Sequence, residues 1–215
     1  FVGMDREVRG KHAALGVPFS ISGIAGRFQS EVDKPLVNAM LGQALAGVYL
    51  LAIRLAEVTR IPAVAIVEAR FARLARAGAS RGRDAWRAWG TGAAIGVLAM
   101  AITAAGLVAI LPWLMEFLGP AYLQAAELLP LALVLAAVQT IRQAGRPLQI
   151  AATAVRSVAR IDVFTMVTML AACFVGIKVA GTRGALYAAI GTEVLAVMLM
   201  AGTWLALQRI ENKSR

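Results

Sequence analysis

The hydrophobic positions of this chain gather in long blocks that are separated by short polar stretches. The longest block without a charged residue runs from Ala88 to Met115, which is 28 residues. A helix needs about 20 apolar residues, at 1.5 Å each, to cross the hydrocarbon core of a bilayer. The pattern therefore predicts membrane-spanning helices.

Hydropathy and turn residues together predict six such helices. Their expected ranges are 13–33, 44–75, 88–116, 123–141, 161–179 and 184–207. Residues that favour turns lie between them, at Met40-Leu41-Gly42, Gly78-Ala79-Ser80, Gly119-Pro120, Gly145-Arg146-Pro147 and Gly181-Thr182. We therefore expect an all-α, polytopic integral membrane protein in which residues 1–215 form one six-helix bundle.

Lysine and arginine residues are distributed unequally between the two sides of these spans. Sixteen lie in residues 1–12, 70–87, 142–160 and 209–215, whereas the other side has only Lys34, Lys178 and Arg183. Cytoplasmic loops of membrane proteins are enriched in these residues. Both ends of the segment are therefore expected in the cytoplasm, and an even number of spans is expected because one helix more or fewer would break the alternation.

Composition agrees with a membrane location. The chain is 60% hydrophobic and 16% charged, with a mean hydropathy of +0.72, against about 45–50% and about 25% in average soluble domains. The net charge of +10 lies largely in the predicted cytoplasmic loops. We therefore expect contact with anionic membrane lipids and no nucleic-acid partner.

Few residues are suited to catalysis. Cys173 is the only cysteine and lies in an apolar run, so an internal disulfide is excluded, and His12, the only histidine, flanks the first span. We expect no enzyme activity, cofactor or metal site. The chain begins at Phe1 without an initiator methionine, and its charged first residues do not resemble a signal peptide, so we expect further sequence upstream.

Six ionisable residues lie too far inside the predicted spans to belong to a loop. They are Arg27, Glu31, Arg54, Glu57, Arg60 and Glu193. A charge at the bilayer centre costs about 2.5–3.5 kcal/mol on insertion scales, so these side chains must face each other or water. Spacings of three or four residues place those of each helix on one face. On the first helix the resulting polar stripe comprises Ser20, Gly23, Arg27, Glu31 and Lys34.

Two interpretations of these charges remain open. In the first, the arginines line a water-filled cavity and bind an anionic group such as a pyrophosphate, which a guanidinium contacts through several donors. In the second, Arg27 with Glu31 and Arg54 with Glu57 form ion pairs that hold the bundle together. Glu193, roughly 14 Å from the start of its helix, is expected near the midplane.

Pro62 lies inside the second span, where it removes a backbone hydrogen bond, and it is either a hinge or a static kink. Arg60 and Glu68 are expected to extend towards the cytoplasmic surface. Solvated or capping roles are expected for three more acids, Glu116, Glu127 and Asp162.

Several short motifs resemble the second half of polysaccharide flippases. These proteins export O-antigen and capsule repeats and belong to the multidrug/oligosaccharidyl-lipid/polysaccharide exporter superfamily. The motifs are Asp33-Lys34, Met40-Leu41-Gly42, Ala46-Gly47-Val48-Tyr49, Ala52-Ile53-Arg54-Leu55, Arg70-Phe71-Ala72-Arg73-Leu74-Ala75, Phe117-Leu118-Gly119-Pro120-Ala121-Tyr122 and Ala126-Glu127-Leu128-Leu129-Pro130.

The resemblance implies a transporter of twelve or more helices, of which this chain is the C-terminal bundle and a further N-terminal six-helix bundle is the partner. It implies that an undecaprenyl-diphosphate-linked oligosaccharide is flipped across the bacterial inner membrane, by alternating access around a cationic cavity. The candidate substrate-binding residues are Arg27, Glu31, Asp33, Lys34, Arg54, Glu57 and Glu193, with Pro62 as the candidate hinge.

Three other functions make different demands on the sequence. An ion-coupled multidrug exporter of the same superfamily would favour acidic and aromatic cavity residues, and aromatic residues make up only 7% of the chain. A non-transporting scaffold subunit would have fully paired charges and no aqueous cavity. A membrane-embedded transferase would need a catalytic constellation, which the sequence lacks.

Overall fold

The computed structural model describes residues 6–80, 83–151 and 155–213, and over these residues the chain is all-α, as expected. The helices are α1 (Arg6–Glu31), α2 (Asp33–Leu41), α3 (Gln43–Ala69), α4 (Phe71–Ser80), α5 (Arg83–Leu118), the 3₁₀ turn η1 (Pro120–Tyr122), α6 (Leu123–Ala151) and α7 (Val155–Lys213). Backbone angles at Ala180 and Gly181 are not helical, so α7 consists of two arms.

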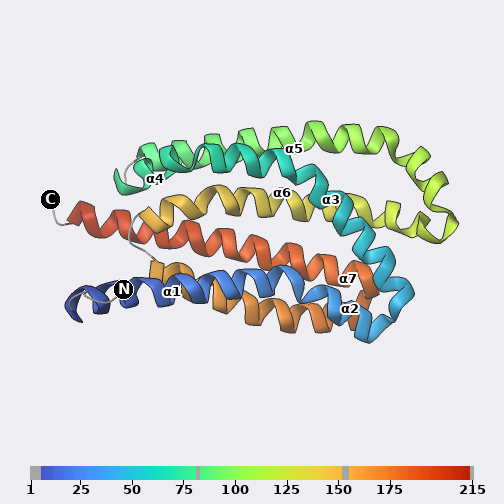
Figure 1. Cartoon of the computed structure of the whole chain (residues 1–215), viewed down its shortest axis with the longest axis horizontal. Helices are drawn as coiled ribbons and strands as arrows, with labels where there is room; N and C mark the ends of the chain where they lie inside the picture. Colours follow the sequence, from blue (N-terminus) through green and yellow to red (C-terminus); the bar gives the residue numbers. More distant parts are fainter. Residues whose placement is uncertain (1–5, 81–82, 152–154, 214–215) are drawn as a thin grey trace.

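The long helices run side by side along one axis (Figure 1). The start of α1 and the end of α7 lie at the same end of the bundle, together with the end of α6 and the start of α5. The junction of α2 with α3 and the bend between the arms of α7 lie at the opposite end. The two arms of α7 therefore form an antiparallel helical hairpin.

Among the described residues, three helical stretches are long and apolar enough to cross a membrane. They are Asp84–Leu118, Leu123–Ala151 and Arg156–Ala206, the last of which includes both arms of α7. The expected spans in α1 and α3 are not among them. In α3, Arg54, Glu57 and Arg60 interrupt the apolar sequence, whereas in α1 residues 12–26 are uncharged but include several glycine and serine residues. Over its described residues the chain is thus an all-α protein with three helical stretches suited to a membrane.

Three of the predicted turns are confirmed by glycines with positive φ. Gly42, Gly119 and Gly181 have φ angles of 85°, 90° and 59°, a region that residues with a Cβ rarely adopt. These glycines end α2, precede η1 and separate the arms of α7. In each case the change of direction requires a backbone conformation that glycine adopts at low cost.

Several predicted boundaries are wrong. No turn forms at Gly145-Arg146-Pro147, since α6 continues to Ala151, and Gly78-Ala79-Ser80 still belongs to α4. Gly145 is buried in close contact with Trp89, whose indole donates to the Ile141 carbonyl at 3.0 Å. Tertiary packing therefore keeps α6 helical through residues that favour turns.

The first two predicted spans also end differently from expectation. The first ends at Glu31, because Asp33 begins the separate helix α2. The second is divided at Arg70, where α3 ends and α4 begins.

Two apolar clusters hold the helices together. The larger joins α2, α3, α6 and α7 around side chains such as Val37, Tyr49 and Leu186, and the smaller includes Leu148 and Trp204. Helix α1 packs along α7, but within the described residues its backbone does not contact α3 or α6. Helices α1 and α3 therefore stand apart from each other.

The α7 hairpin depends on two glycines, Gly176 and Gly184. A Cβ atom added to Gly184 would overlap the carbonyl group of Gly176, whereas one added to Gly191 would meet open space. We expect Gly184→Ala to lower stability by at least about 2 kcal/mol, since overpacking costs about 1–3 kcal/mol or more. Gly191→Ala should be neutral or slightly stabilising. Thermal unfolding in detergent measures both, and equal melting temperatures would contradict the close packing.

Candidate functional site: a charged cavity between α1 and α3

A cavity of about 600 Å³ occupies the space between α1 and α3. Helix α6, the two arms of α7 and Asp33 of helix α2 supply the rest of its walls. Its lining contains glutamine, serine and threonine side chains and an unusual number of charges for a protein suited to a membrane. The charged lining residues are Arg27, Glu31, Asp33, Glu57, Arg60, Arg142, Arg146 and Glu193.

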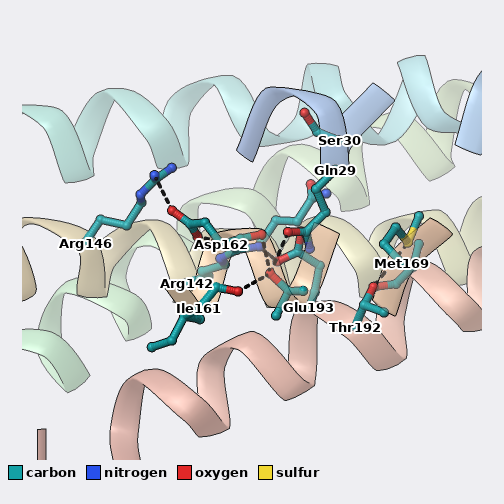
Figure 2. A network of polar contacts seen from close by, with 12 residues as sticks. Gln29, Ser30, Arg142, Arg146, Ile161, Asp162, Met169, Thr192 and Glu193 are labelled. Carbon is teal, nitrogen blue, oxygen red and sulfur yellow. Dashed lines mark hydrogen bonds and ion pairs between the residues drawn. The ribbon is translucent and has the colours of Figure 1, made fainter. Parts of the chain in front are cut away.

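At one side of the cavity, Arg142 binds two carboxylates at once. Its guanidinium lies 2.5 Å from Asp162 Oδ1 and 2.9 Å from Glu193 Oε2, and all three side chains are buried. Figure 2 shows Arg142 between these two acids. Because Asp162 and Glu193 belong to opposite arms of α7, Arg142 of α6 holds the hairpin closed.

The same network extends onto α1. Gln29 donates a hydrogen bond to Glu193 Oε1 at 3.3 Å and accepts one from Thr165 at 2.9 Å. Its amide therefore satisfies the carboxylate oxygen that Arg142 leaves free, as Figure 2 shows. Through this glutamine the buried charges connect α1 to both arms of α7.

Arg146, one turn after Arg142, provides a second link to α1. Its guanidinium lies 3.1 Å from Asp162 Oδ2 and donates to the Ser22 hydroxyl at 3.0 Å, while Ser22 also donates to Asp162. The side chain lies against Gly26, where a Cβ would come within 3.5 Å of it. Polar side chains thus join α1 to α6, although the two helix backbones do not meet.

A second ionic cluster lies between α2 and α3. Lys34 is 2.7 Å from Glu31 and 3.6 Å from Glu57, and Arg54 is 2.6 Å from Glu57. Lys34 and Arg54 do not line the cavity. They form ion pairs with Glu31 and Glu57, which do line it. Arg54 is 59% exposed, so its pair with Glu57 is expected to stabilise the fold by no more than about 1 kcal/mol.

Asp33 forms a buried contact between two helices. It is buried at the start of α2, where its Oδ2 accepts a hydrogen bond of 2.5 Å from the Tyr49 hydroxyl of α3. Asp33 therefore links α2 to α3 and is not free to bind a ligand through that oxygen.

Two arginines of the lining, Arg27 and Arg60, have no carboxylate partner among the described residues. The Arg27 side chain is exposed to the cavity, and Arg60 is half-buried and donates to the neutral amide of Gln139. Among the described lining residues, Glu31, Glu57 and Glu193 are paired with cations, and Asp33 accepts a hydrogen bond from the Tyr49 hydroxyl through one of its two oxygens. The cavity can therefore attract an anion through these two guanidinium groups.

The structure places the seven candidate residues in different settings. Five of them line the cavity, namely Arg27, Glu31, Asp33, Glu57 and Glu193, whereas Lys34 and Arg54 lie outside the lining. The expected pair of Arg54 with Glu57 is present, but Glu31 pairs with Lys34 and not with Arg27. Pro62 lies within α3, and its role as a hinge remains a prediction.

Sequence reasoning missed the residues at the centre of the network. The turn predicted at Gly145-Arg146-Pro147 places Arg142 and Arg146 in a loop, whereas both lie within helix α6. Asp162 was expected to be solvated or to cap a helix, which is wrong, since it is 2% exposed and paired with both arginines. Arg60 was expected to extend towards the surface, but it lines the cavity. The spacing of four residues between Arg142 and Arg146 is the signal in the sequence that could have indicated a shared site, because it places both side chains on one face of a helix.

Within the part of the chain that the structure describes, no group of three or more histidine, cysteine, aspartate or glutamate side chains is placed to hold a metal ion. Comparison of the chain with protein families, with curated proteins and with solved structures finds no match. The fold and the site themselves define the class, an all-α protein with helices suited to a membrane and a charged cavity between its helices.

Replacing Arg142 with glutamine tests the buried network. Arg142→Gln leaves the buried Glu193 carboxylate without a cation and Asp162 with Arg146 alone, and we expect a loss of about 3–5 kcal/mol of unfolding free energy. Arg183→Gln is the matched control, because Arg183 forms an exposed pair with Glu127 and should contribute at most about 1 kcal/mol. Unfolding in mixed micelles measures both variants.

Neutralising the two acids as well, with Asp162→Asn and Glu193→Gln, should recover part of the stability that Arg142→Gln loses. An Arg142→Gln protein as stable as the Arg183→Gln control would show that these charges do not hold the bundle together.

Proposed function

We propose that this chain is the six-span half of a membrane transporter that flips an anionic, lipid-linked oligosaccharide, with its diphosphate bound by Arg27 and Arg60. The observation that supports this most is the cavity of about 600 Å³ in which these two arginines lack carboxylate partners. The resemblance of the sequence motifs to polysaccharide flippases suggests the identity of the substrate.

In this proposal the six spans are α1, α3, α5, α6 and the two arms of α7. The start of α1 and the end of α7 lie at one end of the bundle (Figure 1), which agrees with an even number of spans. That end is rich in lysine and arginine, so we place it in the cytoplasm of a bacterial cell, on the inner face of the cytoplasmic membrane.

The proposed substrate suits the chemistry of the lining. A diphosphate offers several anionic oxygens to the guanidinium groups of Arg27 and Arg60, which bind such oxygens with more than one donor each. Gln139, Gln143 and Ser30 also line the cavity and can hydrogen-bond to sugar hydroxyls. A volume of about 600 Å³ falls within the range of about 300–1,000 Å³ of small-molecule sites.

The cavity lies where a second bundle would complete it. Helices α1 and α3 do not contact each other in the described part of the chain, so the space between them is open to a facing helical bundle. We propose that an N-terminal six-helix bundle of the same protein covers this side. Alternating access would then expose the bound diphosphate first to one leaflet and then to the other.

The lining favours this substrate over a cationic drug. A multidrug exporter would present unpaired acids or aromatic rings to a cation, but the acids of this cavity are engaged and none of its described lining residues is aromatic. A scaffold subunit would have no reason to keep a polar cavity, since each buried charge in a membrane is costly.

We expect Arg27→Gln with Arg60→Gln, in the full-length protein, to reduce export of surface polysaccharide at least tenfold at unchanged protein level. Losing two charge-assisted contacts of about 1.5–3 kcal/mol each accounts for this change. Arg183→Gln, an exposed arginine outside the cavity, is the control and should export normally. Arg54→Ala should have a smaller effect than Arg27→Ala, because Arg54 is outside the lining.

Export is measured by immunoblotting surface polysaccharide in cells that lack the native gene, with a membrane blot for protein level. Normal polysaccharide in the double variant would refute the proposed role of the two arginines.

A further inference from the structure

A second cavity, of about 590 Å³, lies on the other face of α1, against the first arm of α7. None of its described lining residues belongs to the charged cavity. Six of the lining side chains are apolar and the remaining two are arginines. The lining consists of Pro18, Ile21, Arg156, Ala159, Arg160, Val163, Phe164 and Val167. We call this feature the α1–α7 groove.

The charged and the apolar side chains of the groove lie at different positions along its length. Arg156 and Arg160 are one turn apart on α7, both are exposed, and neither has an ion-pair or hydrogen-bond partner among the described residues. No acid occurs among the described lining residues. The apolar part is also exposed, with Ile21 at 43%, Phe164 at 55% and Val167 at 58%.

The dimensions of the groove match one leaflet of a bilayer. The lining positions of α7 recur at intervals of three and four residues, so they form one face of the helix. From Arg156 to Val167 that face is about 16 Å long at 1.5 Å per residue, close to half of the ~30 Å hydrocarbon core. Arg156 is also the first residue of a stretch suited to cross a membrane.

We propose that the α1–α7 groove binds an anionic phospholipid from the leaflet at the basic end of the bundle. Its phosphate contacts Arg156 and Arg160, and an acyl chain lies on the apolar floor from Val163 to Val167. Two unpaired cations at the end of an apolar groove complement a lipid, which has its charge at one end. A partner helix would instead place apolar side chains against both guanidinium groups and leave them unpaired.

Native mass spectrometry of the purified full-length protein with phosphatidylglycerol and with phosphatidylcholine tests the proposal. We expect phosphatidylglycerol to bind at least tenfold more tightly. The double substitution R156Q/R160Q should weaken its binding by roughly tenfold to thirtyfold, since each basic residue near the surface contributes about 1 kcal/mol towards anionic lipids. Val167→Trp, which fills the floor, should weaken binding of both lipids.

The matched control is R73Q/R76Q, which removes two exposed arginines of α4 that lie outside the groove and should preserve the lipid preference. Equal binding of the two lipids, or unchanged binding by R156Q/R160Q, would overturn the proposal. Displacement of the lipid by inorganic phosphate alone would also overturn it, because the site would then recognise phosphate and not a lipid. The Arg27 and Arg60 variants should retain lipid binding, so this result is independent of the transport test.

Discussion

The arrangement of the helices depends on one buried interaction, the contact of Arg142 with both Asp162 and Glu193. These acids come from opposite arms of α7 and are 2.5 Å and 2.9 Å from the same guanidinium. Removing a buried arginine from such a pair would leave uncompensated charge in a medium of low dielectric constant. The interaction therefore fixes the α7 hairpin against α6, and through Gln29 and Ser22 it also fixes the position of α1.

That position creates the cavity. Helix α1 is held to α6 and α7 by long polar side chains, and its backbone stays apart from that of α6. On the other side, Lys34 and Asp33 of α2 connect to Glu57 and Tyr49 of α3. The space between these two sets of contacts is the cavity, whose lining includes eight charged side chains among the described residues. Glu31, Glu57 and Glu193 are paired with cations, and Arg27 and Arg60 remain without an ion-pair partner in the described part of the chain.

The sequence predicted the helical class, the three glycine turns and most of the helices that are suited to a membrane, because these depend on local hydropathy and on backbone conformations that favour glycine. It also indicated that Arg27, Glu31, Glu57 and Glu193 face a common space. It did not predict Arg142, Arg146 and Asp162. Their burial depends on α6 remaining helical past Gly145 and Pro147, which packing against Trp89 decides and local propensity does not.

We expect the cavity to contain water and to have a net positive potential from Arg27 and Arg60. Ser30 lines it, and Cys173, the only native cysteine, is buried. A Ser30→Cys thiol, in a Cys173→Ala background, can therefore be labelled from water with anionic and cationic thiosulfonates in turn. We predict faster labelling by the anionic reagent, because a positive potential raises its local concentration, and protection by an undecaprenyl diphosphate. No labelling, or faster labelling by the cationic reagent, would contradict the account.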